Sequence, residues 1–176
     1  GEMSEFTVRG TRVAVVGGAA SGVAAARLLV ERGAAVTLTD LRPALDAAAE
    51  LASIGVSLAL GSHPDGLLTG SDLVVISPGV PFDQPAVAAA RAAGVPVIGE
   101  VELASRWLRG RMVAITGTKG KSTTTALTGR MLEAAGVRVL VGGNIGTPLA
   151  SHVTLSTPET VHVVEVSSFQ LETADT

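Results

Sequence analysis

The stretch MVAITGTKGKSTTT, Met112 to Thr125, combines an apolar run, a glycine-rich loop and the start of a segment with helical periodicity. This order of strand, loop and helix is typical of a phosphate cradle, because glycines let backbone N–H groups close on phosphate oxygens. In such a loop Lys121 can reach a transferring phosphoryl group, and the Ser122 hydroxyl is placed to hold Mg²⁺. The stretch therefore predicts a nucleoside triphosphate site with ATP as its occupant.

The loop is a short variant of the common pattern G-x-x-x-x-G-K-[ST]. Counting back from Gly120 places Ile115 where that pattern has its first glycine, and Gly117 lies three residues before Gly120 instead. Lys119 has two interpretations, a side chain that helps to cradle phosphate or a solvated loop residue. The alternative for the whole loop is a structural turn, but Gly-Lys-Ser directly between a strand and a helix is seldom accidental.

Outward from this stretch, short β-branched runs alternate with alanine-rich segments, which predicts strand–helix units around parallel sheets and therefore an α/β fold. Helical periodicity marks Ser21–Arg32 and Ser122–Ala135, which are followed by Gly33 and Gly136 as helix stops. The predicted strands lie at 12–16, 35–39, 56–60, 73–76, 95–98, 112–116, 138–141 and 161–166.

A charged connection at Leu108–Arg111 predicts a boundary between two domains. Residues 1–108 form a Rossmann-like parallel-sheet domain, and residues 109–176 begin a P-loop domain. The second domain has about 65 residues and three predicted strands, which are too few to enclose a nucleotide on both sides. We therefore expect the chain to be a truncated protein.

The first domain carries a second glycine-rich turn, GGAASG at Gly17–Gly22, and Asp40 closes the next strand eighteen residues later. This is the arrangement of dinucleotide-binding folds, except that Ala19 replaces the middle glycine of G-x-G-x-x-G, which disfavours NAD. The helix start with Ser21, Asp40 and Arg42 still suits a diphosphate-linked nucleotide. A turn that only packs helix on strand is the alternative.

Three further loops are candidate ligand contacts. SPGVP, Ser77 to Pro81, follows a strand at the edge where open α/β sheets bind ligands, and a rigid connection is its equal alternative. GGNIG exposes the amide of Asn144 among glycines, and by itself it indicates only a loop. Glu165 ends an apolar strand, where an unpaired acid is costly, so we predict that it completes the Mg²⁺ site opposite Ser122. A solvated strand end is its alternative.

Composition narrows the class of protein. A net charge of −3 and 2% aromatic residues provide neither the basic face nor the stacking rings of a nucleic-acid binder. No apolar run approaches the roughly 20 residues of a membrane span, and the N-terminus lacks a secretory signal, so we expect a cytoplasmic protein. The absence of cysteine excludes thiolate catalysis, and the scattered His63, His152 and His162 do not predict a metal cluster.

Taken together, these motifs resemble the Mur ligase family of peptidoglycan synthesis over nearly the whole chain. The short loop GTKGKSTTT and GGNIG are similar to the family's own loops, and SSFQLE at Ser167–Glu172 resembles the branch that adds D-glutamate. SPGVP and IGEVELA, Ile98 to Ala104, strengthen that choice. Two positions depart from the pattern, Ala19 and Leu41, where a threonine is expected after Asp40.

The resemblance implies an ATP-dependent amide ligation in which ATP phosphorylates the carboxylate of UDP-N-acetylmuramoyl-L-alanine and the amine of D-glutamate attacks the acyl phosphate. The resemblance also implies that the D-glutamate site belongs to a further domain that these residues do not include. We therefore expect this chain to bind the UDP-substrate but to lack ligase activity. We also expect it to be a monomer. Three rival predictions are a non-catalytic UDP-sugar-binding module, an NAD-dependent oxidoreductase and a folate-polyglutamate type of ligase.

Residue by residue, the resemblance assigns roles to the candidate positions. It implies that Lys121, Glu165 and Asn144 are catalytic and that Ser122 and Glu165 hold Mg²⁺. The implied ATP contacts are Gly117, Thr118, Lys119, Gly120, Lys121, Ser122 and Thr123. The implied substrate contacts are Ser21, Asp40, Arg42, Ser77 and Asn144.

Overall fold

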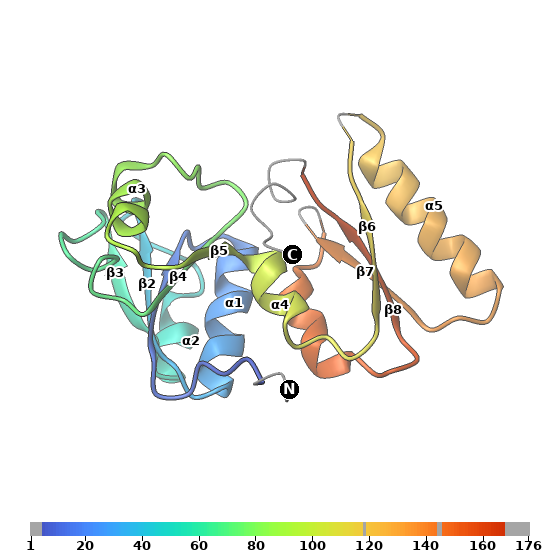
Figure 1. The fold of residues 1–176 in the computed structure, drawn as a ribbon, viewed down its shortest axis with the longest axis horizontal. Helices are drawn as coiled ribbons and strands as arrows, with labels where there is room; N and C mark the ends of the chain where they lie inside the picture. Colours follow the sequence, from blue (N-terminus) through green and yellow to red (C-terminus); the bar gives the residue numbers. More distant parts are fainter. Residues whose placement is uncertain (1–4, 118, 144–145, 168–176) are drawn as a thin grey trace. The chain divides into compact units, whose positions relative to one another are not determined.

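A computed structural model describes residues 5–117, 119–143 and 146–167. The chain divides into two compact units, Gly1–Ile98 and Gly99–Thr176 (Figure 1). Each unit contains a parallel sheet with helices against it, so the α/β class predicted from the sequence is confirmed. None of the described helices is long and apolar enough to cross a bilayer.

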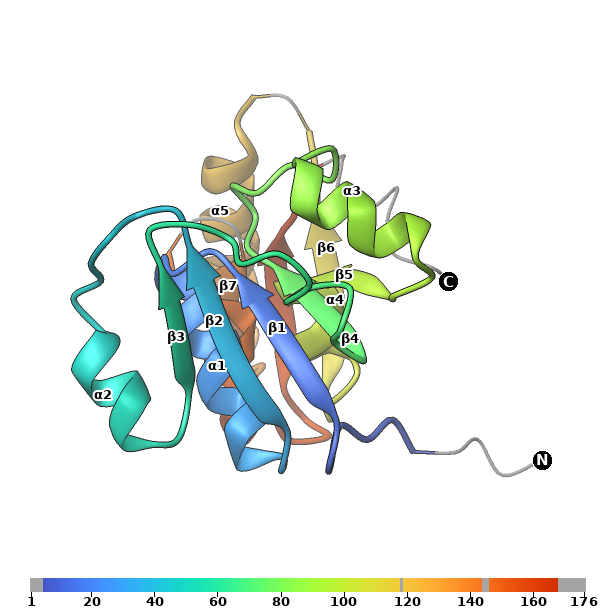
Figure 2. The same cartoon turned by 90° about the vertical axis from the view of Figure 1, so that its left-hand side faces the viewer.

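The first unit is built on a five-stranded sheet in the order β3-β2-β1-β4-β5, and Figure 2 shows its strands side by side. The strand order reverses between β1 and β4, whose residues are nearly all buried because the sheet is covered on both faces. The strands are β1 (Arg12–Val16), β2 (Ala35–Asp40), β3 (Ser57–Leu60), β4 (Leu73–Ile76) and β5 (Val97–Gly99).

Three helices accompany this sheet, α1 (Ala20–Glu31), α2 (Ala48–Ser53) and α3 (Pro85–Ala92). α1 buries its small and branched side chains and ends before Gly33, which has a φ of 88° and is the predicted helix stop. α3 packs through Val87 and Ala90 on a core made with β1, β4 and Leu68. α2 and α3 are too short for a periodicity argument to find them.

The second unit contains a three-stranded parallel sheet in the order β6-β8-β7, with β8 in the middle. Its strands are β6 (Arg111–Ile115), β7 (Val139–Gly143) and β8 (Val161–Glu165). Its helices are α4 (Glu100–Ser105), α5 (Lys121–Ala134) and the 3₁₀ helix η1 (Leu149–Leu155). Gly136, with a φ of 81°, follows α5 as predicted.

α4 belongs to the second unit, so the compact units divide before Gly99, ahead of the predicted connection at Leu108–Arg111. The physical reason is a long-range contact, since the buried Glu100 carboxylate accepts a hydrogen bond from the Ala150 N–H of η1. Sequence composition marks a charged connection but not such a contact.

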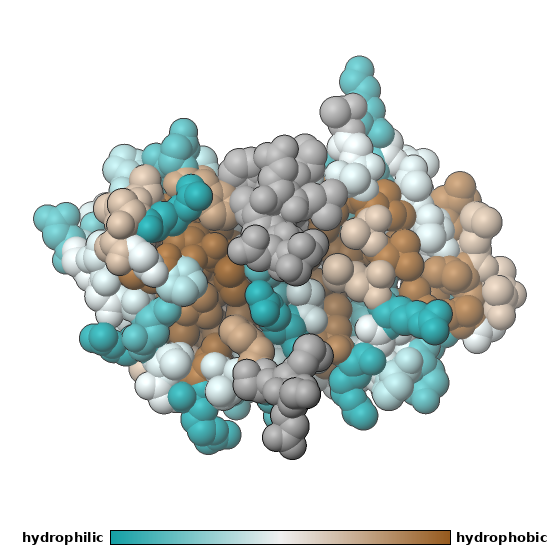
Figure 3. All heavy atoms as spheres, in the orientation of Figure 1, coloured by the Kyte–Doolittle hydropathy of each residue, from teal (hydrophilic) through white to brown (hydrophobic). Residues whose placement is uncertain are grey.

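Apolar side chains remain exposed on the second unit. Figure 3 shows brown surface over the region that contains α5 and the second sheet. The exposed large apolar residues there are Met112, Val113, Leu127, Met131 and Val141. Large exposed apolar side chains are often found where a surface contacts other polypeptide.

We expect Gly22→Ala to destabilise the first unit, because a Cβ at Gly22 would fall on the carbonyl oxygen of Gly17 and within 2.8 Å of the Ser77 hydroxyl. Overpacking against a backbone atom costs about 1–3 kcal/mol. Urea unfolding followed by circular dichroism measures the loss. The matched control is Gly79→Ala, where a Cβ would meet nothing within 4 Å and φ is not positive; equal destabilisation of both variants would contradict the packing argument.

Candidate functional site

The phosphate loop connects β6 to α5 through two glycines with positive φ. Gly117 has a φ of 153°, and Gly120 precedes the first helical residue with a φ of 76°. A side chain would strain either position, which explains glycine there. The first N–H groups of α5 lack intrahelical partners, because no helical carbonyl precedes them, and N–H groups at the start of a helix are oriented to meet an anion. Lys121, the first residue of the helix, lies with its Cγ 3.8 Å from the place of a Cβ on Gly117.

Glu165 is brought to this loop by the pairing of parallel strands. It is the last residue of the central strand β8, directly opposite Ile115 in register, and is only 3% exposed. The Ser122 hydroxyl donates a hydrogen bond of 3.1 Å to its Oε2 atom. The sequence-predicted pair is therefore in contact, with a carboxylate from one strand and a hydroxyl from the neighbouring helix.

These two oxygens fit a magnesium site. Mg²⁺ takes oxygen ligands at about 2.0–2.1 Å in octahedral geometry, so adjacent ligands lie about 3 Å apart. The Ser122 and Glu165 oxygens already have that separation, at 3.1 Å. Lys119 and Thr123 are exposed beside them. Thr118 and Asn144, the other predicted contacts of this unit, lie outside the described residues.

Asp40 occupies the carboxyl end of β2 in the first unit and organises the turn before α1. Its Oδ2 atom accepts a hydrogen bond of 2.7 Å from the Gly18 N–H. Arg42 donates to both carboxylate oxygens, from its backbone N–H and Nε at 2.8 and 3.1 Å to Oδ1 and from Nη2 at 2.8 Å to Oδ2. The Arg42 side-chain hydrogen bond is the largest cause that lowers the pKa of Asp40 well below its ordinary value. Asp40 is therefore an ionised anchor, and 56% of the Arg42 side chain remains exposed.

Ala19, at the position of the missing middle glycine, is compatible with the turn. It precedes α1 with a φ of −73° and a ψ of −179°, an extended conformation that any residue adopts. Gly22 is the residue that close packing requires. Ala19 and Ala20, at the start of α1, are thus exposed residues, while the predicted contact Ser21 is buried at 9% exposure.

Ser77 lies at the end of β4, next to β1, where the strand order of the sheet reverses. Its hydroxyl donates to the carbonyl of Gly17 at 3.1 Å, and the residue is 5% exposed. The structure therefore brings Ser77 to the same turn as Asp40, but its hydroxyl holds the turn from inside. A ligand above the turn would meet the backbone that Ser77 and Asp40 fix.

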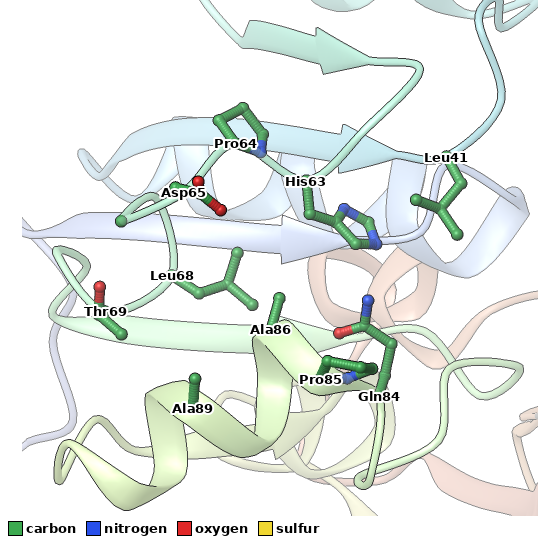
Figure 4. A pocket seen from close by; sticks show the side chains of 11 residues that line it. Leu41, His63, Pro64, Asp65, Leu68, Thr69, Gln84, Pro85, Ala86 and Ala89 are labelled. Atoms are coloured by element: carbon green, nitrogen blue, oxygen red, sulfur yellow. The ribbon is translucent and has the colours of Figure 1, made fainter.

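A cavity of about 430 Å³ opens beside Leu41 in the first unit (Figure 4). His63 and Gln84 point toward one another across it, and Ala86 and Ala89 of α3 form one wall. The Nδ1 atom of His63 lies 2.8 Å from the Thr39 hydroxyl, and Gln84 Oε1 accepts from the backbone of α3. No sequence pattern predicts this cavity, because the loop after β3 and the start of α3 meet only in three dimensions.

A second feature that the sequence patterns did not predict is a buried carboxyl group in the second unit, that of Glu100. Glu100 is 0% exposed, and its Oε1 atom accepts from the Ala150 N–H at 2.7 Å. Oε2 has no hydrogen-bond partner within the described part of the chain. Burial raises the pKa of Glu100 to about 7, and the Ala150 hydrogen bond partly offsets that effect. Its position as the first residue of a short helix gives no signal of a partner 50 residues later.

Histidine 162 belongs to the same unit and its tautomer follows from Ser156. The Ser156 Oγ atom accepts from the backbone N–H groups of Arg109 and Gly110 at 2.9 and 3.1 Å, so its own hydrogen is directed to His162 Nε2 at 2.7 Å. This arrangement favours the neutral His162 ring with its hydrogen on Nδ1, an atom that has no hydrogen-bond partner within the described part of the chain. Burial lowers the pKa of both His162 and His152, and for His162 the charge of His152 adds to the effect.

Across the described ranges, no group of three or more acidic, histidine or cysteine side chains is arranged to hold a metal ion.

The fold defines an α/β class of protein, in which a Rossmann-like unit with a five-stranded parallel sheet is followed by a second unit with a three-stranded parallel sheet. Residues 11–99 match the family described as Mur ligase MurD-like, N-terminal domain. The chain belongs to this MurD-like family of Mur ligases, as its motifs predicted.

Curated relatives give the same result. The chain is 56% identical over 173 residues to the "UDP-N-acetylmuramoylalanine--D-glutamate ligase" of Anaeromyxobacter dehalogenans, covering 97% of this chain and 37% of that protein. It is 51% identical over 176 residues to the protein of the same name from Syntrophotalea carbinolica, covering 99% and 38%. The chain thus spans less than two fifths of the length of these relatives.

Solved structures share the fold. A murein peptide ligase from Psychrobacter arcticus matches with a TM-score of 0.55 and 19% identity, covering 91% of this chain and 39% of that one. The UDP-N-acetylmuramate-alanine ligase MurC of Thermotoga maritima matches with a TM-score of 0.53 and 22% identity, covering 89% and 37%. At these identities the likeness concerns the architecture alone.

We expect the stability of the chain to depend on Glu100 in a pH-dependent way. Its pKa is 4.5 when unfolded and about 7 when folded, so the folded state binds the proton more tightly and loses stability as pH rises through this range. The loss amounts to about 3 kcal/mol once both states are ionised. Glu100→Gln lacks this titration, so its stability relative to the wild type should increase between about pH 5 and about pH 8.5.

Urea unfolding at both pH values measures this difference. Glu159→Gln is the matched control, because Glu159 is exposed in the same unit. If the difference between Glu100→Gln and the wild type stays constant between the two pH values, the buried, protonated carboxyl is contradicted.

Proposed function

We propose that this chain is the UDP-substrate-binding and ATP-binding part of a ligase that adds D-glutamate to UDP-N-acetylmuramoyl-L-alanine. The observation that supports this most is the contact between Ser122 and Glu165 at the end of a phosphate loop. The names of the relatives, at 51% and 56% identity, support the D-glutamate branch. The cofactors of the proposed reaction are ATP and Mg²⁺.

The reaction joins a carboxylate and an amine. A carboxylate oxygen of the UDP-substrate attacks the γ-phosphorus of ATP and ADP leaves, which gives an acyl phosphate; the amine of D-glutamate then attacks the acyl carbon and phosphate leaves. Such phosphoryl transfer depends on positioning and charge neutralisation. The N–H groups at the start of α5 bind phosphate oxygens, and the Lys121 ammonium neutralises the charge of the transferring group.

Ser122 and Glu165 are the residues of this chain that would hold Mg²⁺. When bound, the ion shields the negative charge of the phosphates from the incoming carboxylate. The protein's own contribution is rigidity, since Glu165 is 3% exposed at the end of a central strand. Asn144 remains the proposed contact to the substrate near its reacting carboxylate.

The first unit is proposed to hold the uridine diphosphate end. Its diphosphate would meet the exposed first turn of α1 at Ala19 and Ala20, where helix N–H groups attract anions. Asp40 fixes the Gly18 N–H and the Arg42 guanidinium on one carboxylate, which leaves the exposed part of Arg42 to meet phosphate charge. Ser77 supports the turn from below by its bond to Gly17.

Calorimetric titration of this chain with UDP-N-acetylmuramoyl-L-alanine tests the first unit. We expect selective binding over UDP and NAD, and a loss of about tenfold or more in Asp40→Asn, because the neutral amide no longer anchors Arg42. The control is Asp72→Asn, which makes the same change at the start of β4, where Asp72 accepts from the Arg12 N–H. Tighter binding of NAD than of the muramoyl nucleotide would overturn the assignment of this unit.

Lys121→Ala tests the phosphate loop in a chimera in which this chain replaces the matching segment of the Anaeromyxobacter dehalogenans ligase. We expect the unsubstituted chimera to form the dipeptide product and the variant to lose more than about 100-fold in kcat, because the transferring phosphoryl group loses its cation. The variant of the 176-residue chain should keep its affinity for the UDP-substrate. Neither form of the isolated chain should turn over ATP into product, and measurable ligation by the isolated chain would refute its predicted inactivity.

A further inference from the structure

Glu100 connects two elements of the second unit that are far apart in the sequence. It is the first residue of α4, it is completely buried, and its Oε1 atom accepts from the Ala150 N–H in the first turn of η1. A buried carboxyl group is costly unless its contacts require it. An apolar side chain would fill the same space at lower cost, so the hydrogen bond to η1 is the property that distinguishes glutamate here.

The segment that Glu100 anchors contacts the end of the strand that pairs with the proposed magnesium ligand. η1 begins after Pro148, and the carbonyl of the preceding Thr147 accepts from the Gly143 N–H at 3.0 Å. Gly143 pairs in register with Glu165, and a Cβ on Gly143 would fall on the Glu165 carbonyl oxygen. The end of β7 therefore lies against the backbone of the residue whose carboxylate accepts from Ser122.

The buried ring of His152 supports the same strand end. It projects from η1, and its Cε1 and Nδ1 atoms lie 3.2 and 3.3 Å from the place of a Cβ on Gly142. A displacement of η1 would move both the Thr147 hydrogen bond and this ring. The position of η1 is thus coupled to Gly142 and Gly143, and through them to Glu165.

We propose that Glu100 is a positioning residue for the magnesium and phosphate site, because it fixes η1 and thereby holds the end of β7 against the backbone of Glu165. The effect of Glu100 on catalysis rests on the proposed function, whereas the anchoring of η1 by Glu100 does not. Glu100 acts through Ala150 and η1 and does not contact the reacting groups. The other titratable groups of the packed elements are Glu102 on α4 and His152 on η1.

The first test is hydrogen–deuterium exchange of this chain. Glu100→Leu fills the space but removes the acceptor, and amide exchange in residues 146–155 should rise by about tenfold or more. Glu100→Gln keeps an oxygen acceptor and is neutral, like the protonated carboxyl, so it should keep the wild-type exchange rate. Glu159→Gln, an exposed change in the same unit, is the control.

If residues 146–155 of Glu100→Leu exchange at the wild-type rate, the proposed anchoring of η1 by Glu100 is overturned. If Glu100→Leu does not fold, Glu100→Gln decides alone: retained protection supports the role of the acceptor, and lost protection overturns it.

The second test measures ligase activity of the chimera against Mg²⁺ concentration. Glu100→Leu should raise the Mg²⁺ concentration for half-maximal rate by about tenfold, as loss of a group that orients a metal ligand does. Glu100→Gln should restore the wild-type value, which a defect in folding alone would not explain. Faster exchange with an unchanged Mg²⁺ dependence would overturn the link to the metal site. An unsubstituted chimera that folds without ligase activity would instead overturn the proposed function, and the exchange result would still decide the anchoring.

Discussion

Parallel pairing of β6, β8 and β7 is the constraint on which the second unit depends, because it brings three carboxyl ends to one edge. Ile115, Glu165 and Gly143 lie side by side in register across that edge. The phosphate loop leaves from one side and the glycine-rich strand end lies on the other, so Glu165 stands between them. A carboxylate on the central strand can then contact the loop hydroxyl while remaining 3% exposed.

The first unit uses the same edge differently. Its turn after β1 is tightened by the close approach of Gly22 to Gly17 and is held from two sides by Asp40 and Ser77. Here the carboxylate binds backbone and a guanidinium rather than a hydroxyl, and it is ionised because those donors lower its pKa. The two units thus share the strand–loop–helix plan. In the second unit the carboxylate accepts from a hydroxyl, and in the first it accepts from a backbone N–H and an arginine.

Sequence patterns predicted the parts of this structure that local chemistry determines. Within the described residues, all eight strands, both long helices and their glycine stops follow from periodicity and from the φ that glycine tolerates. The contact of Ser122 with Glu165 followed from strand-end logic. The Glu100 contact, the cavity beside Leu41 and the division before Gly99 did not, because they arise from packing between residues that are distant in the sequence and involve short helices of six or eight residues. Local periodicity does not predict contacts between residues that are distant in the sequence.

The buried titratable groups of the second unit make opposite contributions to the pH dependence of its stability, and these contributions limit the pH range in which the unit is most stable. Glu100, with a pKa of about 7, favours the folded state in its protonated form. His152 and His162 have a pKa below 6.5 because of burial, so the unfolded state takes up their protons first and stability falls as pH drops below that value. Protonated His162 would also place a second hydrogen against the Ser156 hydroxyl, whose oxygen already accepts two N–H groups. A falling pH therefore works against the two buried histidines and a rising pH against Glu100, while η1 is anchored by a carboxyl group and the connection to β6 by a hydroxyl.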